Sequence, residues 1–460
     1  MSEVDTGDAR VRVAIIGSGP AGSYAAGQLL SHSATELHVD LFERLPTPWG
    51  LVRAGVAPDH PKIKSVTRVY ERTAEHSRLR YYGNVEFGRE ITLEDLRAHY
   101  NAIVYAVGTP VDRALGIPGE DLARSYAATD FVGWYNGHPD FTDHEFDLRG
   151  ERALVIGAGN VALDVARMLM LTHHELATTD VADHALEALT ESNISEVLVI
   201  ARRGPEQAAF TNPELLELAE LSAADVIVEE DELALVDGLP DPHADVTARR
   251  NVEILKEYAL RPPSGKPRRV ALRFLLSPLA IEGSRGVERV VLARNKLVGE
   301  GDGSLRASAT SEEITIPAHA VFRAIGYRGT PLPDVPFDER RSVIANVGGR
   351  VVGPDGLRHG EYVVGWAKRG PSGVIGTNKK DANDTVARLL EDLGGGRLLA
   401  PAAIGDAALD AFIRARAPNL VDYAGWARID RHERKLGEPH GRPRIKLTRV
   451  QEMLAAAKRR

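Results

Sequence analysis

Two glycine-rich loops have the residue types and spacing that most directly indicate chemistry. The first, at residues 17–22, reads GSGPAG; it follows a short β-branched run and precedes a helix-like segment. In such a loop the first glycine permits a tight turn, the second admits a pyrophosphate, and the third lets the helix pack closely on the strand. The helix N-terminus favours the negative charge of the phosphate. The loop therefore predicts a dinucleotide site formed by Gly17, Ser18, Gly19, Ala21 and Gly22.

An acidic residue stands where the ribose of such a dinucleotide would lie. Glu43 ends the next strand-like run, 38–42, and comes 21 residues after Gly22. A carboxylate at this place can accept hydrogen bonds from ribose hydroxyls. Together the two strands and the helix form a βαβ unit of about 30 residues. The alternative is an ordinary strand–turn–helix whose glycines serve packing alone, and the context of the motif argues against it.

The second loop, at residues 157–162, reads GAGNVA and follows the strand-like run 153–156. Alanine in the third glycine position is an accepted variant. Its companion strand, 196–201, ends in two arginines, and paired guanidinium groups bind a 2′-phosphate that a carboxylate would repel. The alternative for these arginines is solvated surface charge. The loop predicts an NADP site formed by Gly157, Ala158, Gly159, Asn160, Val161, Arg202 and Arg203.

Two dinucleotide motifs in one chain predict FAD together with a nicotinamide nucleotide. The ribose acid suits FAD at the first loop, and the arginines suit NADP(H) at the second. Two further strand-like runs, 102–107 and 320–325, each lead into a glycine and are interpreted as strands that return beneath a bound cofactor. The sequence thus predicts an α/β fold with two Rossmann-like dinucleotide-binding domains.

Composition narrows the classes of protein. A length of 460 residues predicts about three domains or two large ones, and 43% hydrophobic with 27% charged residues is ordinary globular composition. The net charge of −8 argues against nonspecific nucleic-acid binding. The absence of cysteine excludes disulfides, redox dithiols and cysteine-ligated iron–sulfur clusters, and we expect no metal site. No run reaches the ~20 apolar residues of a membrane helix, and the N-terminus lacks a signal pattern, so we expect no membrane insertion and a cytoplasmic protein.

Several motifs together resemble one family. They are GSGPAG at 17–22, GLVRAGVAPDHPK at 50–62, FVGWYNG at 131–137, GNVALDVAR at 159–167, RRGPEQ at 202–207 and GWAKRGPSGVI at 365–375. Over residues 11–395 the chain resembles the adrenodoxin-reductase-like ferredoxin–NADP reductases, FAD flavoproteins of the glutathione-reductase-type fold. The resemblance implies an NADP-binding domain, 113–330, inserted into a discontinuous FAD-binding domain, 11–112 and 331–460.

The resemblance also implies further site residues. Those for FAD are Leu51, the backbone near Phe87, Trp366, Gly373, Val374 and Ile375; those for NADP are Arg113, Glu214 and again Gly373. His60 and Glu214 are expected to position nicotinamide against flavin. Both residues have a plainer alternative: His60 is a turn residue between prolines, and Glu214 is an acid favoured at a helix N-terminus. The plainer alternative for Trp366 is a core residue. Gly376 and 378–380 depart from the threonine-rich run expected after the last motif, which puts contacts at the FAD pyrimidine end in doubt.

The expected function is electron transfer from NADPH through FAD to an acidic ferredoxin-type iron–sulfur protein, reversible in principle. The redox chemistry belongs to the cofactor, so no protein nucleophile is needed. The densest basic stretch, 249–273, is the expected docking site, with a solvated helix and loop as the alternative. Two other functions stay open: an FAD- and NADPH-dependent monooxygenase or oxidase acting on oxygen and a small substrate, and a non-enzymatic redox-sensing flavoprotein. The sequence leaves the oligomeric state unknown.

Overall fold

The structure is a computed structural model that describes residues 10–234, 241, 243–301, 303–373, 375–402 and 404–459. The chain divides into two compact units. The first contains the residues up to Val56, His60–Val111 and the chain from Tyr327 onwards, and the second contains Ala57–Asp59 and Asp112–Gly326. A first unit built from distant parts of the chain, with the second between them, agrees with the predicted fold class.

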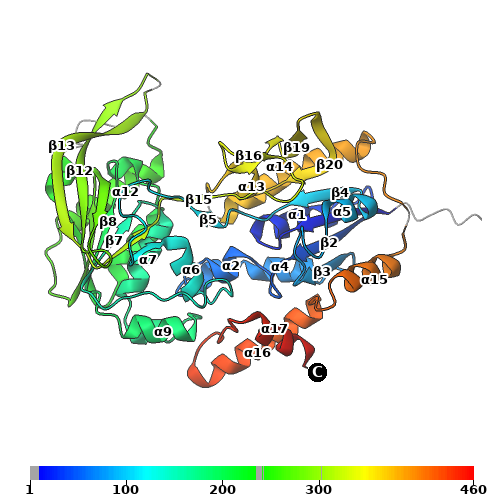
Figure 1. Ribbon diagram of the computed structural model, residues 1–460, viewed down its shortest axis with the longest axis horizontal. Helices are drawn as coiled ribbons and strands as arrows, with labels where there is room; N and C mark the ends of the chain where they lie inside the picture. The colour runs from blue at the N-terminus through cyan, green and yellow to red at the C-terminus, as the bar shows by residue number, and fades with distance from the viewer. Residues whose placement is uncertain are drawn as a thin grey trace, which may run out of the picture. The chain divides into compact units, whose positions relative to one another are not determined.

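A seven-stranded sheet forms the centre of the first unit (Figure 1). Its order is β18-β19-β20-β4-β1-β2-β3. The central strand β1 pairs in parallel with β2 and β4, and β20 pairs in parallel with β4. Val13, Ala14 and Ile15 of β1 are completely buried, as in a parallel strand covered on both faces. The strands are β1 (Val11–Ile16), β2 (Leu37–Glu43), β3 (Leu79–Gly83), β4 (Ala102–Tyr105), β18 (Asn346–Val347), β19 (Arg350–Gly353) and β20 (Gly356–Val363).

Helices of the first unit come from both ends of the chain. Helices α1 and α14 pack against each other, although hundreds of residues separate them in sequence. Helix α14 begins at Ile375, two residues after Gly373. The helices are α1 (Pro20–Leu30), α2 (Leu51–Ala54), α3 (Pro61–Lys64), α4 (Thr67–Ala74), α5 (Leu93–His99), α13 (Trp366–Arg369), α14 (Ile375–Gly394), α15 (Asp406–Arg416), α16 (Tyr423–Gly437), η3 (Glu438–His440) and α17 (Val450–Lys458). Short strands are β5 (Val111–Asp112), β15 (Tyr327–Arg328), β16 (Phe337–Asp338) and β17 (Val343–Ile344).

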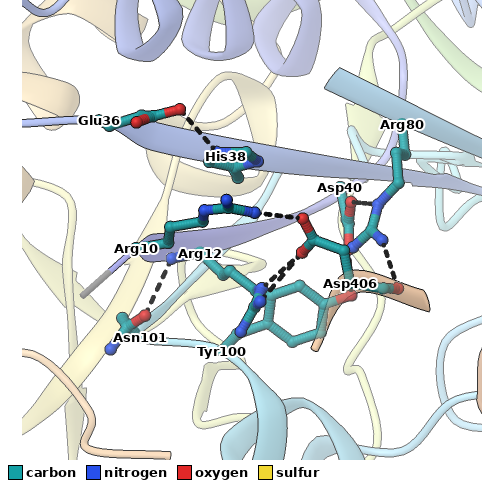
Figure 2. Close-up of polar contacts among 9 residues, drawn as sticks. All are labelled: Arg10, Arg12, Glu36, His38, Asp40, Arg80, Tyr100, Asn101 and Asp406. Carbon is teal, nitrogen blue, oxygen red and sulfur yellow. Dashed lines mark hydrogen bonds and ion pairs between the residues drawn. The ribbon is translucent and has the colours of Figure 1, made fainter. Parts of the chain in front are cut away.

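The C-terminal helices belong to the first unit through polar contacts with its sheet. Figure 2 shows Asp406, the first residue of α15, accepting hydrogen bonds from Arg10 at 2.8 Å and from Arg12 at 2.9 Å. Arg80 on β3 donates to the Asp406 carbonyl at 3.0 Å and forms two bonds with the buried carboxylate of Asp40 on β2. Burial raises the pKa of Asp406, but the hydrogen bonds and charge of Arg12 outweigh this effect and lower it. Helix α15 is therefore anchored to the sheet at its first residue.

A six-stranded parallel sheet, ordered β6-β14-β7-β8-β10-β9, forms the centre of the second unit. Its strands are β6 (Ser125–Ala127), β7 (Arg152–Ile156), β8 (Glu196–Ile200), β9 (Ala224–Val228), β10 (Arg268–Arg273) and β14 (Ala320–Arg323). A separate antiparallel sheet contains β11 (Leu276–Glu282) and the long hairpin of β12 (Arg289–Gly299) and β13 (Leu305–Pro317) (Figure 1). The helices are α6 (Ala128–Tyr135), α7 (Asn160–Met170), α8 (His173–Leu176), α9 (Asp183–Thr190), η1 (Pro205–Gln207), α10 (Asn212–Glu217), η2 (Leu218–Glu220), α11 (Glu230–Ala234) and α12 (Val246–Ala259).

The basic stretch 249–273 is a helix and a loop up to residue 267, as its alternative interpretation supposed, but not beyond it. Helix α12 ends at Ala259, and residues 268–273 form β10, which lies between β8 and β9. Val270 and Leu272 are buried in the sheet core, so burial rather than charge determines the structure of this segment. Within the described part of the chain, no helix has both the length and the apolar character needed to cross a membrane.

Candidate cofactor sites

The first glycine loop has steric reasons for its glycines. Gly17 has a φ of +107°, and a Cβ there would lie 2.5 Å from the Ala106 carbonyl oxygen at the end of β4. A Cβ on Gly22 would lie 2.0 Å from the Gly17 carbonyl oxygen. The turn and the close packing of α1 on the sheet therefore leave no room for a side chain. Gly19 is the N-cap of α1 and provides no side-chain cap, and the first turn carries no acid. The backbone N–H groups at the start of α1 can therefore bind an anion.

Glu43 lies at this loop, as its distance from Gly22 predicted. Its Oε2 accepts hydrogen bonds from the Ser18 amide at 3.1 Å and from the Ser18 hydroxyl at 2.7 Å. Its Oε1 accepts a bond from the Leu45 amide at 3.2 Å. The carboxylate is thereby held at the carboxyl end of β2, beside the start of α1, where it can accept ribose hydroxyls.

Two distant motifs meet the same loop. A Cβ on Gly50, whose φ is +47°, would lie 3.0 Å from the Cα of Gly19. A Cβ on Gly365, whose φ is +71°, would lie 2.6 Å from the Cβ of Ala21. Leu51, next to Gly50, is 41% exposed although it is a large apolar residue. An uncapped helix end, a ribose acid and an exposed apolar side chain around one backbone cradle fit an FAD molecule.

Asp381 on α14 is a site residue that the sequence analysis missed. Its Oδ2 accepts the Gly365 amide at 2.5 Å, and its Oδ1 lies 3.0 Å from the Lys368 ammonium. It is also paired with Arg369 at 3.5 Å. Burial lowers the pKa of Arg369, and the charge of Asp381 opposes this shift. Asp381 fixes the turn that carries Trp366, and nothing in the spacing from Gly365 to an acid 16 residues later signals this contact.

The remaining FAD residues lie as follows. The Trp366 ring is 5.5 Å from the Tyr327 ring, and its Nε1 donates to the Ser372 carbonyl, so Trp366 lies beside the glycine turn. The Phe87 side chain is in the core against Tyr105, so only its backbone is available to a cofactor. Gly373 has a φ of +77°, Ile375 begins α14, and Val374 lies outside the described residues.

The second loop repeats the same geometry. Gly157 has a φ of +141°, and a Cβ there would lie 2.1 Å from the Ala324 carbonyl oxygen after β14. Helix α7 begins at Asn160, its N-cap Gly159 provides no side-chain cap, and its first turn has no acid. The Asn160 side chain accepts the Thr211 amide at 2.8 Å, and the Ala158 carbonyl accepts the Ala209 amide at 2.7 Å. The loop, which continues through Val161, is thus tied to residues 209–211.

Arg202 and Arg203 follow β8 at the sheet edge that holds this loop, because β7 and β8 run parallel. Arg202 is exposed, and neither guanidinium has an ion-pair partner among the residues that the structure describes. Their backbone is fixed by Asn295, whose buried amide donates to the Arg202 carbonyl at 2.7 Å. Arg113 is exposed, and its amide donates to the Gly326 carbonyl at 3.1 Å. The Arg203 guanidinium donates to the Gln207 carbonyl at 3.4 Å, and two guanidinium groups without a carboxylate partner among the described residues, beside a phosphate-type loop, fit a 2′-phosphate.

Arg167 is a second residue that the sequence analysis missed. It is 3% exposed, and four carboxylates surround it: Asp59 at 2.9 Å, Asp164 at 2.8 Å, Glu217 at 2.5 Å and Glu214 at 3.6 Å. Burial lowers the pKa of Arg167, but these carboxylates outweigh burial and raise it. Arg167 therefore ties α7 to α10 and holds the candidate residue Glu214. Its signal was its place in the motif 159–167, where an arginine ends a helix-like run.

The two candidate catalytic residues are both buried, at 7% exposure for Glu214 and 6% for His60. Glu214 belongs to the second unit, on α10. His60 belongs to the first unit, where it is the N-cap residue of α3. Burial of a titratable side chain is consistent with a functional role for each.

Two sheets whose central strands are parallel, each with a phosphate-type loop at the carboxyl ends of those strands, define a two-domain dinucleotide-binding oxidoreductase. The family model described as pyridine nucleotide-disulphide oxidoreductase matches residues 11–203. The NADPH-ferredoxin reductase FprA of Mycobacterium tuberculosis (strain ATCC 25618 / H37Rv) is 51% identical over 454 residues, covering 96% of this chain and 98% of that protein. The mitochondrial NADPH:adrenodoxin oxidoreductase of Salvelinus fontinalis is 41% identical, covering 97% and 91%.

A solved structure gives the same result: Mycobacterium tuberculosis FprA in complex with NADPH has a TM-score of 0.91 at 49% identity, covering 97% of this chain and 99% of that one. The chain belongs to the adrenodoxin-reductase-like family of ferredoxin–NADP reductases. It is an oxidoreductase, and its cofactors are FAD and NADP(H). Because it contains no cysteine, the disulfide chemistry in the description of the family model does not apply to it.

Proposed function

We propose that this protein is a cytoplasmic reductase that moves electrons from NADPH through FAD to an acidic ferredoxin-type iron–sulfur protein, reversibly in principle. The observation that carries the proposal is the difference between the two loops: a ribose acid, Glu43, at the first and, at the second, two arginines that have no ion-pair partner among the described residues. The names of the relatives, NADPH-ferredoxin reductase and NADPH:adrenodoxin oxidoreductase, support the same acceptor class.

We assign FAD to the first unit and NADP(H) to the second, with domains at 11–112, 113–330 and 331–460. FAD, when bound, accepts a hydride and releases electrons singly, which suits a one-electron partner. The chain's own groups bind and orient: backbone amides after Gly17 hold the pyrophosphate, Glu43 holds the ribose, and Asp381 fixes the turn at Gly365.

In the second unit, Arg202 and Arg203 select NADPH through the 2′-phosphate, and Asn295 fixes their backbone. Arg167 holds Glu214 in place from α7. Glu214 and His60 are assigned to positioning the nicotinamide against the flavin, with Gly373 close to both rings. A buried carboxylate held by a buried arginine is rigid, and rigidity is what such positioning requires.

The test is NADPH-dependent reduction of cytochrome c with and without added ferredoxin. We expect rapid reduction that requires ferredoxin and is much slower with NADH. Oxygen uptake that depends on a small substrate, with no ferredoxin effect, would indicate a monooxygenase or oxidase. NADPH binding without turnover of any acceptor would indicate a redox-sensing protein. As a control for the cofactor, the bound flavin is released by heating the protein and identified by its mass. Finding FMN instead of FAD would refute the cofactor assignment.

A further inference from the structure

The basic stretch 249–273 keeps two exposed cations, Arg249 and Arg261, without an ion-pair partner among the described residues. Most of its cations are paired inside the second unit, either with carboxylates or with carbonyl oxygens. The pairs are Arg250 with Glu253 and Glu257, Arg269 with Glu196, Arg273 with Glu232, Lys266 with the Leu221 carbonyl and Arg268 with the Met170 and Leu171 carbonyls. A cavity of about 760 Å³ beside it is lined by both signs of charge. The number of cations along a stretch of the sequence therefore does not by itself identify the docking site.

A second basic segment, 61–74, keeps its charge exposed. It contains four cations and one acid in a chain whose net charge is −8. Lys62, Arg68 and Arg72 are exposed, and none of the three has an ion-pair partner in the described ranges of the chain. Arg72 Nε donates only to the Arg68 carbonyl at 3.2 Å, one turn earlier on α4. These cations present a local positive field on an otherwise acidic protein.

Large apolar side chains lie among these cations. Ile63 on α3 is 39% exposed and Val69 on α4 is 42% exposed. The opposite face of α4 is firmly anchored, because Tyr70 is 1% exposed and its ring packs against Tyr24 at 5.4 Å and Trp49 at 5.6 Å. A rigid helix that exposes apolar groups within a polar and charged rim has the composition of a protein-docking surface.

The segment is continuous with the chain that surrounds the first glycine loop. Gly50 contacts Gly19 of that loop, α2 follows at once, and α2 contacts α3. A partner seated on α3 and α4 would therefore lie beside the motif segment 50–62, which contains Leu51, the residue that the resemblance assigns to FAD. One-electron transfer requires a short distance between donor and acceptor, so this is a suitable place for the partner.

We propose that the α3–α4 face, formed by Lys62, Ile63, Arg68, Val69 and Arg72, is the docking surface for the acidic iron–sulfur partner. This inference rests on the proposed function and adds the place of docking. The three cations steer the acidic partner at long range, and the two apolar side chains are buried on contact. Steering of this kind raises association rates from about 10⁵–10⁶ to as much as 10⁸–10⁹ M⁻¹s⁻¹ at low salt. It is screened over about 8–10 Å near physiological salt.

The experiment compares three double charge reversals in the full-length holoenzyme. Arg68→Glu/Arg72→Glu changes the proposed face. Arg340→Glu/Arg341→Glu makes the same change of charge at two exposed arginines of the first unit, between β16 and β17. Arg249→Glu/Arg269→Glu makes it in the rival basic stretch. Ferredoxin-dependent cytochrome c reduction is measured at low and high salt, and reduction of a small neutral quinone reports the NADPH and flavin steps alone.

We expect the α3–α4 variant to raise the KM for ferredoxin about tenfold or more at low salt, to lose most of the salt dependence and to keep quinone turnover. The other two reversals should change this KM less than about threefold. Equal losses in all three variants would show a net-charge effect and overturn the proposal, as would an unchanged KM in the α3–α4 variant. If quinone turnover also falls, Arg68→Gln/Arg72→Gln decides, because neutral side chains leave α4 intact. Wild-type protein that reduces quinone but not ferredoxin would refute the proposed function itself.

Discussion

Glu433 on α16 gives the sharpest test of how the C-terminal segment supports the FAD unit. Its carboxylate is completely buried and accepts two bonds from Arg53, at 2.9 and 2.5 Å. It also accepts Arg444 at 3.2 Å and the Leu447 amide at 2.9 Å. Arg53 lies on α2, next to Leu51, and its guanidinium stacks over the Trp426 ring at 5.4 Å. Replacement by glutamine keeps the shape of the side chain and removes its charge.

The expected loss of unfolding free energy in Glu433→Gln follows from the burial of the ion pair. Arg53 is 9% exposed, so Glu433→Gln leaves its cation without a counter-charge in a dry environment. Removing one partner of a buried pair costs about 3–5 kcal/mol. Glutamine can still accept a neutral hydrogen bond, and Arg444 retains Asp430 at 2.7 Å, so we expect the lower end, about 3 kcal/mol.

The measurement is urea unfolding of the holoenzyme, followed by flavin release and by circular dichroism. Urea is used because guanidinium chloride would screen the ion pairs. Glu391→Gln is the matched control: the same chemical change in the same unit, at a side chain that is 50% exposed and paired with exposed Arg388. That pair should be worth less than about 1 kcal/mol. The double variant Arg53→Met/Glu433→Leu should recover much of the loss, because both charges of the buried Arg53–Glu433 pair are then removed.

A loss in Glu433→Gln no larger than in Glu391→Gln would refute the reasoning. It would mean that Arg53 finds water or another acceptor when Glu433 is neutral, and that the contact of α16 with α2 is not held by charge. Loss of stability without any recovery in the double variant would point to packing around Trp426 instead.

Three further predictions concern the cofactor sites and acid stability. Arg202→Gln/Arg203→Gln should weaken the binding of NADPH about 10²-fold or more and leave the binding of NADH nearly unchanged, as measured by titration. Equal losses of affinity for the two coenzymes would contradict selection of the 2′-phosphate. His60→Gln and Glu214→Ala should each lower the limiting rate of flavin reduction in stopped flow at saturating NADPH, and an unchanged rate in both would leave them structural. Burial raises the pKa of Asp392, but hydrogen bonds from arginine outweigh burial and lower the pKa to about 2. The ionised Asp392 therefore stabilises the folded protein above its unfolded pKa of ~3.9, and this stabilisation is lost as the pH falls towards 2. Asp392→Asn should remove this dependence from acid unfolding followed by circular dichroism, and an unaltered acid limb would count against it.

The parts of the site that the sequence predicted are those fixed by short-range geometry. A strand, a glycine loop, a helix and a second strand lie within about 30 residues, and backbone sterics at Gly17 and Gly157 require glycine whatever the rest of the chain does. The end of the companion strand must then lie beside the loop, which is why Glu43 and Arg202 could be placed from spacing. The family motifs added Gly50 and the 365–375 turn.

Only the tertiary structure decided which distant groups meet. The contact of Gly365 with Ala21, the bond from Gly365 to Asp381 and the burial of Arg167 among four carboxylates join segments with no common period or spacing. The same holds for Glu433 on α16, which meets Arg53 on α2 although 380 residues separate them.

The charged residues show most clearly what the sequence alone does not determine. The sequence counts cations, but it does not say which of them are neutralised by partners elsewhere in the chain. Residues 249–273 have the highest local density and are largely paired, whereas the smaller group at Lys62, Arg68 and Arg72 remains free among the described residues. Pairing depends on positions in space, because Coulomb energy follows distance and desolvation rather than order along the chain. The sequence therefore predicted where phosphate and ribose would be bound, and the fold decided which charges are left for a partner.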